Sequence, residues 1–295
     1  MARVGLAQIA PRLGDVEANL ALHGERIGEA LQEGMELLVF PELSLTGYYV
    51  KDLVPRVAQR VTESPVLDTL AQASRDLDLV VGFVEEDERN RFFISAAYLA
   101  DGEVRHLHRK VYLPTYGMFE DNRFFSAGNR LRAFQSRFGP TGLLICEDAW
   151  HLSSPYILWL DGADLLIEIN ASPGYGVSGE AETLAQAEAI GRFNRVYAEL
   201  LTSYLLFCNR VGTEDGAMFW GGSAVIGPTG EVVAQAPLLE ETLLVADIDL
   251  NEVRRVRSRL PLLGDERLRL ALRELTRISW KDAGYPDSDG GPASG

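Results

Sequence analysis

The sequence predicts a mixed α/β fold, because short apolar runs alternate along the chain with longer stretches of helical character. The pattern indicates strand–helix–strand units at both ends of the chain, with hairpins inserted between them. No repeat with a period of roughly 20–50 residues divides the chain. We therefore expect one domain over residues 1–280, followed by a disordered tail over the polar, glycine-rich residues 281–295.

The first half of the chain begins with an expected strand and helix. The helix covers residues 15–33, with Asp15 as its N-cap, and Ser64 caps a second helix whose first residue is Pro65. Asp101 and Gly102 form a strong hairpin signal between two strands. The expected strands of this half cover residues 4–10, 36–40, 79–85, 92–100 and 103–109.

The second half repeats the alternation. Helices are expected over residues 155–162 and 180–202, and Asp249 with Glu252 has capping-box spacing before a basic final helix. The expected strands cover residues 141–146, 164–170, 204–210, 223–228, 231–237 and 243–249.

Composition excludes several classes of partner. Hydrophobic residues make up 46% of the 295 residues and charged residues 24%, as in an ordinary globular protein. A formal net charge of −15 argues against binding to nucleic acid or to an anionic membrane. The first residues do not resemble a secretory signal, since Gln8 interrupts a short apolar stretch, and no apolar run is long enough to span a bilayer.

The two cysteines, Cys146 and Cys208, are too few for a disulfide framework, so we expect a reducing, cytoplasmic location. His106 and His108 alternate on an expected strand and share one face, without a third ligand in view. We interpret them as ordinary surface residues and expect neither a metal ion nor a cofactor.

Three polar residues follow expected strands, where ligand sites of open α/β sheets lie. Glu42 stands in "FPELSLTGYYVKDLV", although it could be a solvated loop residue. Lys110 enters a long loop rich in aromatic residues, "KVYLPTYGMFEDNRFF", which is either functional or a structural plug. Cys146 ends "TGLLIC" at an expected exposed strand terminus, whereas Cys208 lies inside a strand and is interpreted as core.

A thiol, a carboxylate and an amine form a chemically coherent set. A free thiol has a pKa near ~8.5, so a base must take its proton at neutral pH. A carboxylate can do so, and an ammonium can stabilise the charge that develops on a carbonyl oxygen. His151 is a rival base, but it lies only five residues after Cys146.

Together, "FPEL", "RK" before a loop, and "CED" resemble the catalytic set of the nitrilase superfamily of carbon–nitrogen hydrolases. The resemblance covers residues 2 to about 260, and the motifs are most similar to the glutaminase domain of glutamine-dependent NAD synthetases. It implies that Glu42 is the general base, Lys110 the oxyanion partner and Cys146 the nucleophile.

The same resemblance implies further site residues. Tyr48, Tyr116, Glu147 and Ser172 are expected to face the substrate, with Glu147 and Ser172 binding an α-amino group. The family often has a second acidic residue in the loop after the lysine. Here Asp121 takes that place and Glu120 adjoins it, so both stay open.

The resemblance implies an αββα sandwich that forms a homodimer or higher homo-oligomer. The expected activity is hydrolysis of a small-molecule amide through a cysteine thioester, with release of ammonia, as in a glutaminase. No "SGGxDS"-like stretch of an ATP-using domain is present, so ammonia would pass to solvent or to a separate synthetase. The alternatives are a nitrilase, an N-carbamoyl hydrolase, an ω-amidase or a non-catalytic subunit.

Overall fold

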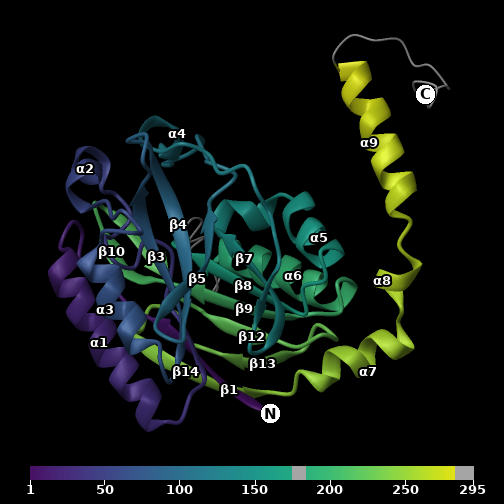
Figure 1. Ribbon diagram of the computed structural model, residues 1–295, viewed down its shortest axis with the longest axis horizontal. Helices are drawn as coiled ribbons and strands as arrows, with labels where there is room; N and C mark the ends of the chain where they lie inside the picture. Colours follow the sequence, from purple (N-terminus) through teal and green to yellow (C-terminus); the bar gives the residue numbers. More distant parts are fainter. Residues whose placement is uncertain (175–183, 283–295) are drawn as a thin grey trace.

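The computed structural model describes residues 1–174 and 184–282. Residues 283–295 of the expected tail lie outside these ranges, as do residues 180–183 of the helix expected over residues 180–202. Within them the chain forms two large sheets with helices on both outer sides (Figure 1).

The first sheet has the strand order β14-β1-β2-β3-β4-β5. Its centre, β1-β2-β3, is parallel, and antiparallel strands extend it on both sides. Its strands are β1 (Ala2–Gln8), β2 (Leu37–Val39), β3 (Asp78–Glu86), β4 (Phe92–Ala100), β5 (Glu103–Arg109) and β14 (Thr242–Ile248).

The second sheet has the order β13-β12-β9-β8-β7-β6, again with a parallel centre, β7-β8-β9. Its strands are β6 (Phe134–Ser136), β7 (Gly139–Ile145), β8 (Leu165–Asn170), β9 (Tyr204–Asn209), β12 (Ala224–Ile226) and β13 (Val232–Gln235). A small hairpin of β10 (Val211–Glu214) and β11 (Ala217–Trp220) follows β9.

Helices α1 (Val16–Gln32) and α3 (Pro65–Ala73) cover the first sheet, and α5 (Ser153–Leu160) and α6 (Ala185–Leu200) cover the second (Figure 1). The short helical turns are η1 (Lys51–Leu53), α2 (Val54–Val57), α4 (Asp121–Phe124) and η2 (Cys146–Trp150). After β14 the chain forms α7 (Asn251–Arg259), α8 (Leu262–Asp265) and α9 (Leu268–Asp282), and α9 projects away from the body. None of the helices in the described ranges is long and apolar enough to cross a membrane.

Three apolar clusters hold these layers together. The central one lies between the sheets, where Leu6 and Val39 belong to the same cluster as Ile145 and Leu206. The other two join each sheet to its outer helices. Burial of apolar side chains on both faces of both sheets is the main stabilising term of such a layered fold. The expected αββα sandwich is confirmed.

The two predicted N-caps and the predicted hairpin are confirmed. Asp15 and Ser64 accept hydrogen bonds from the N–H groups of Ala18 and Leu67, as N-caps do. Asp101 and Gly102 have φ values of 54° and 82°, as a tight hairpin with two left-handed central residues requires.

Two expectations about the chain's second half were wrong. The Asp249–Glu252 capping box does not form, because the Glu252 carboxylate instead accepts a hydrogen bond from Tyr204 at 2.7 Å. The helix after it is not the last, since α8 and α9 follow. Strands β6, β10 and β11, of three or four residues each, were also missed.

Glu168 is a fully buried carboxyl on β8, beside Asn194 of α6. Burial raises its pKa from the ordinary value of 4.5 to about 8, and the amides of Asn170 and Asn194 offset this only in part. The folded protein therefore keeps a proton that the unfolded chain loses as the pH rises through about 4.5.

We expect Glu168→Gln to raise stability at neutral pH and to change it little near pH 4. The stability associated with protonated Glu168 is complete below about pH 4.5 and falls by about 1.4 kcal/mol per pH unit up to about pH 8. Glutamine does not titrate, so melting temperatures should fall less steeply with pH in the variant. Parallel curves for the two proteins would contradict a protonated Glu168.

Candidate active site

The three residues singled out in the sequence follow the ends of three strands. Glu42 comes just after β2, Lys110 directly after β5, and Cys146 directly after β7. β2 and β7 each pair in parallel with a neighbour, so their carboxyl ends lie at one edge of their sheets. The face-to-face packing of the sheets brings these edges together.

Lys110 is the electrostatic centre of the site. Its Nζ donates to Glu42 Oε1 and to Asp121 Oδ2, each at 2.8 Å, and the lysine is fully buried. Of the two acidic residues left open, Asp121 is the one that contacts Lys110, whereas Glu120 is exposed and lies 3.5 Å from Arg123. An ammonium held between two carboxylates is fixed in position and remains charged.

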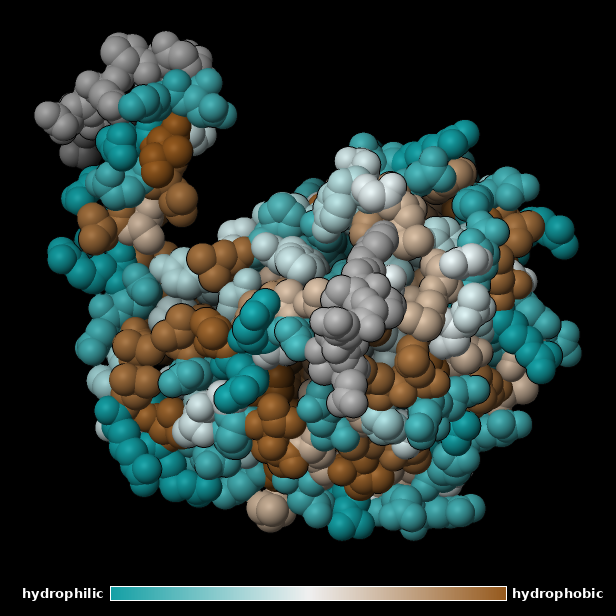
Figure 2. All heavy atoms as spheres, turned by 180° about the vertical axis from the view of Figure 1, so that it is seen from behind, coloured by the Kyte–Doolittle hydropathy of each residue, from teal (hydrophilic) through white to brown (hydrophobic). Residues whose placement is uncertain are grey.

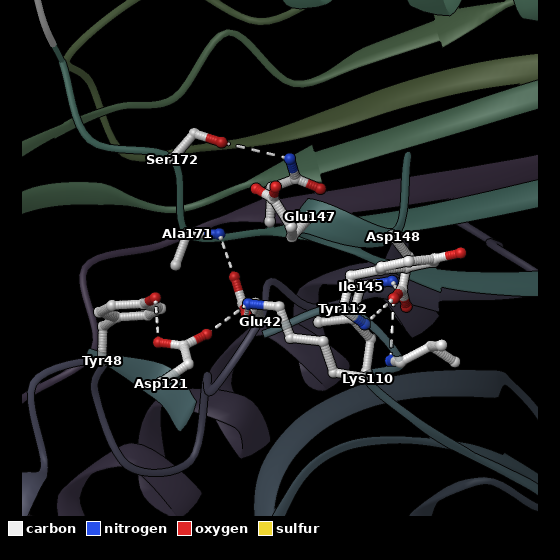
Figure 3. A network of polar contacts seen from close by, with 12 residues as sticks. Glu42, Tyr48, Lys110, Tyr112, Asp121, Ile145, Glu147, Asp148, Ala171 and Ser172 are labelled. Carbon is white, nitrogen blue, oxygen red and sulfur yellow. Dashed lines mark hydrogen bonds and ion pairs between the residues drawn. The ribbon is translucent and has the colours of Figure 1, made fainter. Parts of the chain in front are cut away.

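A continuous chain of polar contacts extends from this lysine (Figure 3). The Tyr48 hydroxyl donates to Asp121 Oδ1 at 2.7 Å, and the N–H of Ala171, just after β8, donates to Glu42 Oε2 at 2.9 Å. Both oxygens of each carboxylate are thus engaged, which fixes the orientation of Glu42 and Asp121.

Burial and charge set the protonation states. Burial raises the pKa of Glu42, while Lys110 opposes the shift. Burial lowers the pKa of Lys110, but Asp121 and Glu42 outweigh it, so this pKa lies well above the ordinary value. Burial and the charge of Glu42 raise the pKa of the Cys146 thiol. The resting site therefore contains a neutral thiol, a charged ammonium and a carboxyl whose basicity is increased.

Cys146 occupies a strained turn. Its φ is 48°, in the left-handed region that residues with a Cβ seldom adopt, and helical turn η2 begins there. The expectation of an exposed strand end was wrong, because Cys146 is only 5% exposed. Cys146 belongs to the central apolar cluster together with Phe119 and Phe125 of the aromatic loop, and strand periodicity does not reveal such a contact between segments.

Asp148 connects the Cys146 turn to the start of the Lys110 loop. Its carboxylate accepts from the N–H groups of Val111 at 2.9 Å, Tyr112 at 3.1 Å and Ile145 at 3.1 Å (Figure 3). His108 Nε2 lies 2.8 Å from Asp148 Oδ2. His108 is therefore buried and engaged, contrary to its interpretation as a surface residue. The motif "CED" contains Asp148, but the sequence does not reveal that the partners of Asp148 include residues 108, 111 and 112.

The expected substrate residues form separate groups. Tyr116 donates its hydroxyl to Glu147 Oε2 at 2.8 Å, while Tyr48 contacts Asp121. Ser172 Oγ accepts from the amide of Asn170 at 3.2 Å, and no hydrogen bond joins it to Glu147 in the described part of the chain. His151 lies 3.7 Å from Glu147 and stacks on Tyr112.

Sequence reasoning missed a buried ion pair that supports Tyr48. Arg210 and Glu214 lie 2.7 Å apart and are almost completely buried. The other oxygen of Glu214 accepts from the N–H groups of Tyr48 and Tyr49 at 2.8 and 2.7 Å. The arginine that follows β9 in "FCNR" was the available signal. Among the described residues no group of three or more side chains suited to a metal ion was found.

Comparison with known proteins identifies the family of the chain. The family model of carbon–nitrogen hydrolases matches residues 3–258. A glutamine-dependent NAD(+) synthetase of Thermotoga maritima is 34% identical over 288 residues, which cover 96% of this chain and 46% of that protein. The chain spans about half the length of the first curated relatives it matches.

Solved structures show the same fold. A carbon–nitrogen hydrolase from Helicobacter pylori G27 superposes with a TM-score of 0.84 at 25% identity, covering 93% of this chain and 98% of that one. An amidase from Nesterenkonia sp. AN1 superposes with a TM-score of 0.77 at 25% identity, covering 92% and 96%. One variant of that amidase carries the acetamide moiety of fluoroacetamide at its active-site cysteine. Since the family model and the synthetase alignment both extend over most of its length, the chain belongs to the carbon–nitrogen hydrolase family.

Proposed function

We propose that this protein hydrolyses the side-chain amide of a small amino acid of the glutamine type, through a thioester on Cys146. The observation that carries the proposal is the buried Lys110 ammonium, held at 2.8 Å from both Glu42 and Asp121 at the sheet edge where Cys146 lies. An ion pair that only stabilised the fold would not require a cysteine with a strained backbone at the same sheet edge.

Acylation uses the three groups in sequence. Glu42 takes the proton of the Cys146 thiol as the sulfur attacks the amide carbonyl carbon. Lys110 and the backbone N–H of Glu147 stabilise the negative oxygen of the tetrahedral intermediate. The intermediate collapses when protonated Glu42 gives its proton to the nitrogen, and ammonia leaves.

Deacylation repeats the chemistry with water. Glu42 takes a proton from water, whose oxygen attacks the thioester carbonyl carbon. The carbon–sulfur bond then breaks, the acid is released, and Glu42 returns its proton to the Cys146 sulfur. Asp121 positions Lys110 in this scheme and exchanges no proton with the substrate.

Glu147 is proposed to select an amino-acid amide. Tyr116 orients its carboxylate at 2.8 Å, and the aromatic loop that carries Tyr116 lies over the Cys146 turn. A carboxylate held in this way can pair with the α-ammonium of glutamine, a contact worth about 1.5–3 kcal/mol. Ser172 is proposed as a second contact for that amino group. Tyr48 is proposed to line the substrate site beside Cys146.

We expect wild type to hydrolyse L-glutamine faster than glutaramate, which has the same carbon chain without the amino group. Glu147→Gln should narrow this preference by about tenfold or more, because about 1.4 kcal/mol of lost ion pairing is a factor of ten. The measurement is kcat/KM for both compounds, with Glu88→Gln, an exposed site, as the charge-matched control.

If wild type prefers glutaramate, or if the ratio of kcat/KM for the two compounds is unchanged in Glu147→Gln, the proposal that the substrate is an amino-acid amide is contradicted. The second candidate function, a hydrolase of simple aliphatic amides, would then replace it. The similarity to the Nesterenkonia amidase over 92% of this chain favours that candidate. A panel that adds nitriles and carbamoyl compounds covers the nitrilase, N-carbamoyl hydrolase and ω-amidase alternatives.

We further propose a homo-oligomer. Helix α9 carries exposed apolar side chains at helical spacing, so that they form a stripe along one face. Figure 2 shows hydrophobic residues along the projecting helix. The residues of the stripe are Leu268, Leu272, Leu275 and Ile278. A second copy of the chain is the proposed partner, and a monomeric mass in sedimentation at micromolar concentration would contradict it.

Two other proposals follow from the relatives and the cysteines. The relatives that are twice as long are NAD(+) synthetases, which supports transfer of ammonia to a separate synthetase. When a synthetase domain that uses free ammonia is added to this protein, glutamine should replace ammonia as the nitrogen donor of the synthetase reaction.

Both cysteines are free, which supports a cytoplasmic location. Localisation of a tagged chain tests this.

A further inference from the structure

A cavity of about 590 Å³ lies along edge strand β5, outside the Glu42–Lys110–Cys146 set. Its lining is strongly basic, with four arginines and two histidines, and contains no acidic side chain among the described residues. The lining is therefore opposite in sign to the chain as a whole, which carries a net charge of −15. The basic residues are Arg91, His106, His108, Arg109, Arg130 and Arg132.

Two of the arginines are held in place from outside the cavity. Arg91 pairs with Asp87 at 2.6 Å, and Arg109 pairs with Glu85. Neither Arg130 nor Arg132 makes an ion pair or a side-chain hydrogen bond within the described residues. Both are exposed to solvent, so two guanidinium groups of the same lining have no carboxylate partner among the described residues and are available to a bound anion.

The cavity lies at the base of the loop that carries Tyr116 and Asp121. The N–H of Gly128 donates to the carbonyl of Lys110 at 2.7 Å and closes this loop. A Cβ at Gly128 would lie 2.2 Å from the carbonyl oxygen of Arg109, so only glycine permits this approach. The basic residues line the cavity from both ends of the loop, Arg109 before it and Arg130 and Arg132 after it.

A chain of contacts joins the cavity to the catalytic turn. His108 lines the cavity and lies 2.8 Å from Asp148. Asp148 in turn accepts from the N–H groups of Val111 and Tyr112, the first residues of the loop. A ligand that bridges the two ends of the loop would therefore act on the segment that positions Lys110.

We propose that this cavity binds a small molecule carrying a phosphate group, and that the bound phosphate fastens the base of the loop over residues 111–127. Arginine side chains recognise phosphate through paired N–H donors, and the cavity has the size of a small-molecule site. A nucleic acid is disfavoured because the acidic chain repels a long polyanion. The inference does not depend on which amide the protein hydrolyses.

The test is calorimetric titration with inorganic phosphate and with pyrophosphate, at constant ionic strength and with chloride as the competing anion. We expect saturable one-to-one binding of at least one of them. The stronger of the two shows whether the site suits a monophosphate or a diphosphate. Arg130→Gln/Arg132→Gln should weaken binding by at least about tenfold, since it removes the two guanidinium groups of the lining that have no carboxylate partner among the described residues.

The matched control is Arg254→Gln/Arg259→Gln, which removes the same charge from exposed positions of α7 and should leave binding unchanged. Equal weakening by both double variants, or no saturable binding by wild type, overturns the site. Amide exchange over residues 111–127 should slow with ligand in wild type, and binding without slower exchange overturns the fastening of the loop. Neither readout uses turnover, so failure here is distinguishable from failure of the proposed hydrolysis.

Discussion

Cys146→Ala should lose all measurable ammonia release while its melting temperature changes little. The thiol is the only nucleophile placed at the Lys110–Glu42 edge in the proposed mechanism, and alanine cannot form a thioester. The substitution removes one atom from a turn at the mouth of the sheets, so the layers retain their packing. The measurements are ammonia release at saturating glutamine and thermal unfolding.

Cys208→Ala is the matched control, since it removes the same atom from the other cysteine. Cys208 is fully buried between the sheets, with its sulfur 3.2 Å from the carbonyl of Val39. We expect it to cost about 1–2 kcal/mol of stability and to preserve kcat, because it leaves a small cavity far from the reacting atoms. Residual turnover in Cys146→Ala, or loss of kcat in Cys208→Ala at unchanged melting temperature, contradicts the assignment of the two thiols.

Lys110→Met should reduce kcat by about 10²–10³, the usual effect of removing one oxyanion donor. It should also destabilise the protein by several kcal/mol, because Glu42 and Asp121 would face each other without a cation between them. Glu42 acts as a base only when deprotonated, so activity falls as the pH drops through its pKa. Loss of the lysine charge raises that pKa further, and the acid limb of the kcat profile should move to higher pH.

The control for this variant is Lys51→Met, which removes an exposed lysine paired with Asp215. An exposed pair contributes little, so stability and the pH profile should both stay near those of wild type. If Lys110→Met retains near-normal turnover, or if its acid limb does not move, another group stabilises the oxyanion and Lys110 is structural.

The strand ends were predictable from the sequence because β2 and the end of β7 are short apolar runs, and β5 is an alternating strand that leads directly into Lys110. Glu42, Lys110 and Cys146 are found at such positions without knowledge of long-range contacts. The choice between Asp121 and Glu120 was not predictable in this way, since the two are adjacent and equally acidic. The structure distinguishes them because α4 directs Asp121 toward Lys110 and leaves Glu120 in solvent.

Contacts between distant segments account for what the sequence did not reveal. Cys146 shares its apolar cluster with Phe119 and Phe125 of the aromatic loop. Asp148 accepts from N–H groups that lie 37 and 36 residues earlier in the chain. Arg210 and Glu214 lie only four residues apart in sequence, but the role of their ion pair becomes clear only where Glu214 accepts from the backbone of Tyr48. Short elements such as β10 and β11 are set by tertiary pairing and carry almost no periodic signal.

The most direct test of the central claim is intact-mass analysis of enzyme that is acid-quenched during turnover of glutamine, followed by peptide mapping. The mechanism predicts an acyl adduct on the peptide that contains Cys146, released by hydroxylamine and absent from Cys146→Ala. Slowing deacylation with Glu42→Gln after loading by an activated ester should increase its amount. Rapid turnover with no adduct in any quenched sample, or an adduct on a peptide without Cys146, would contradict a thioester at this residue.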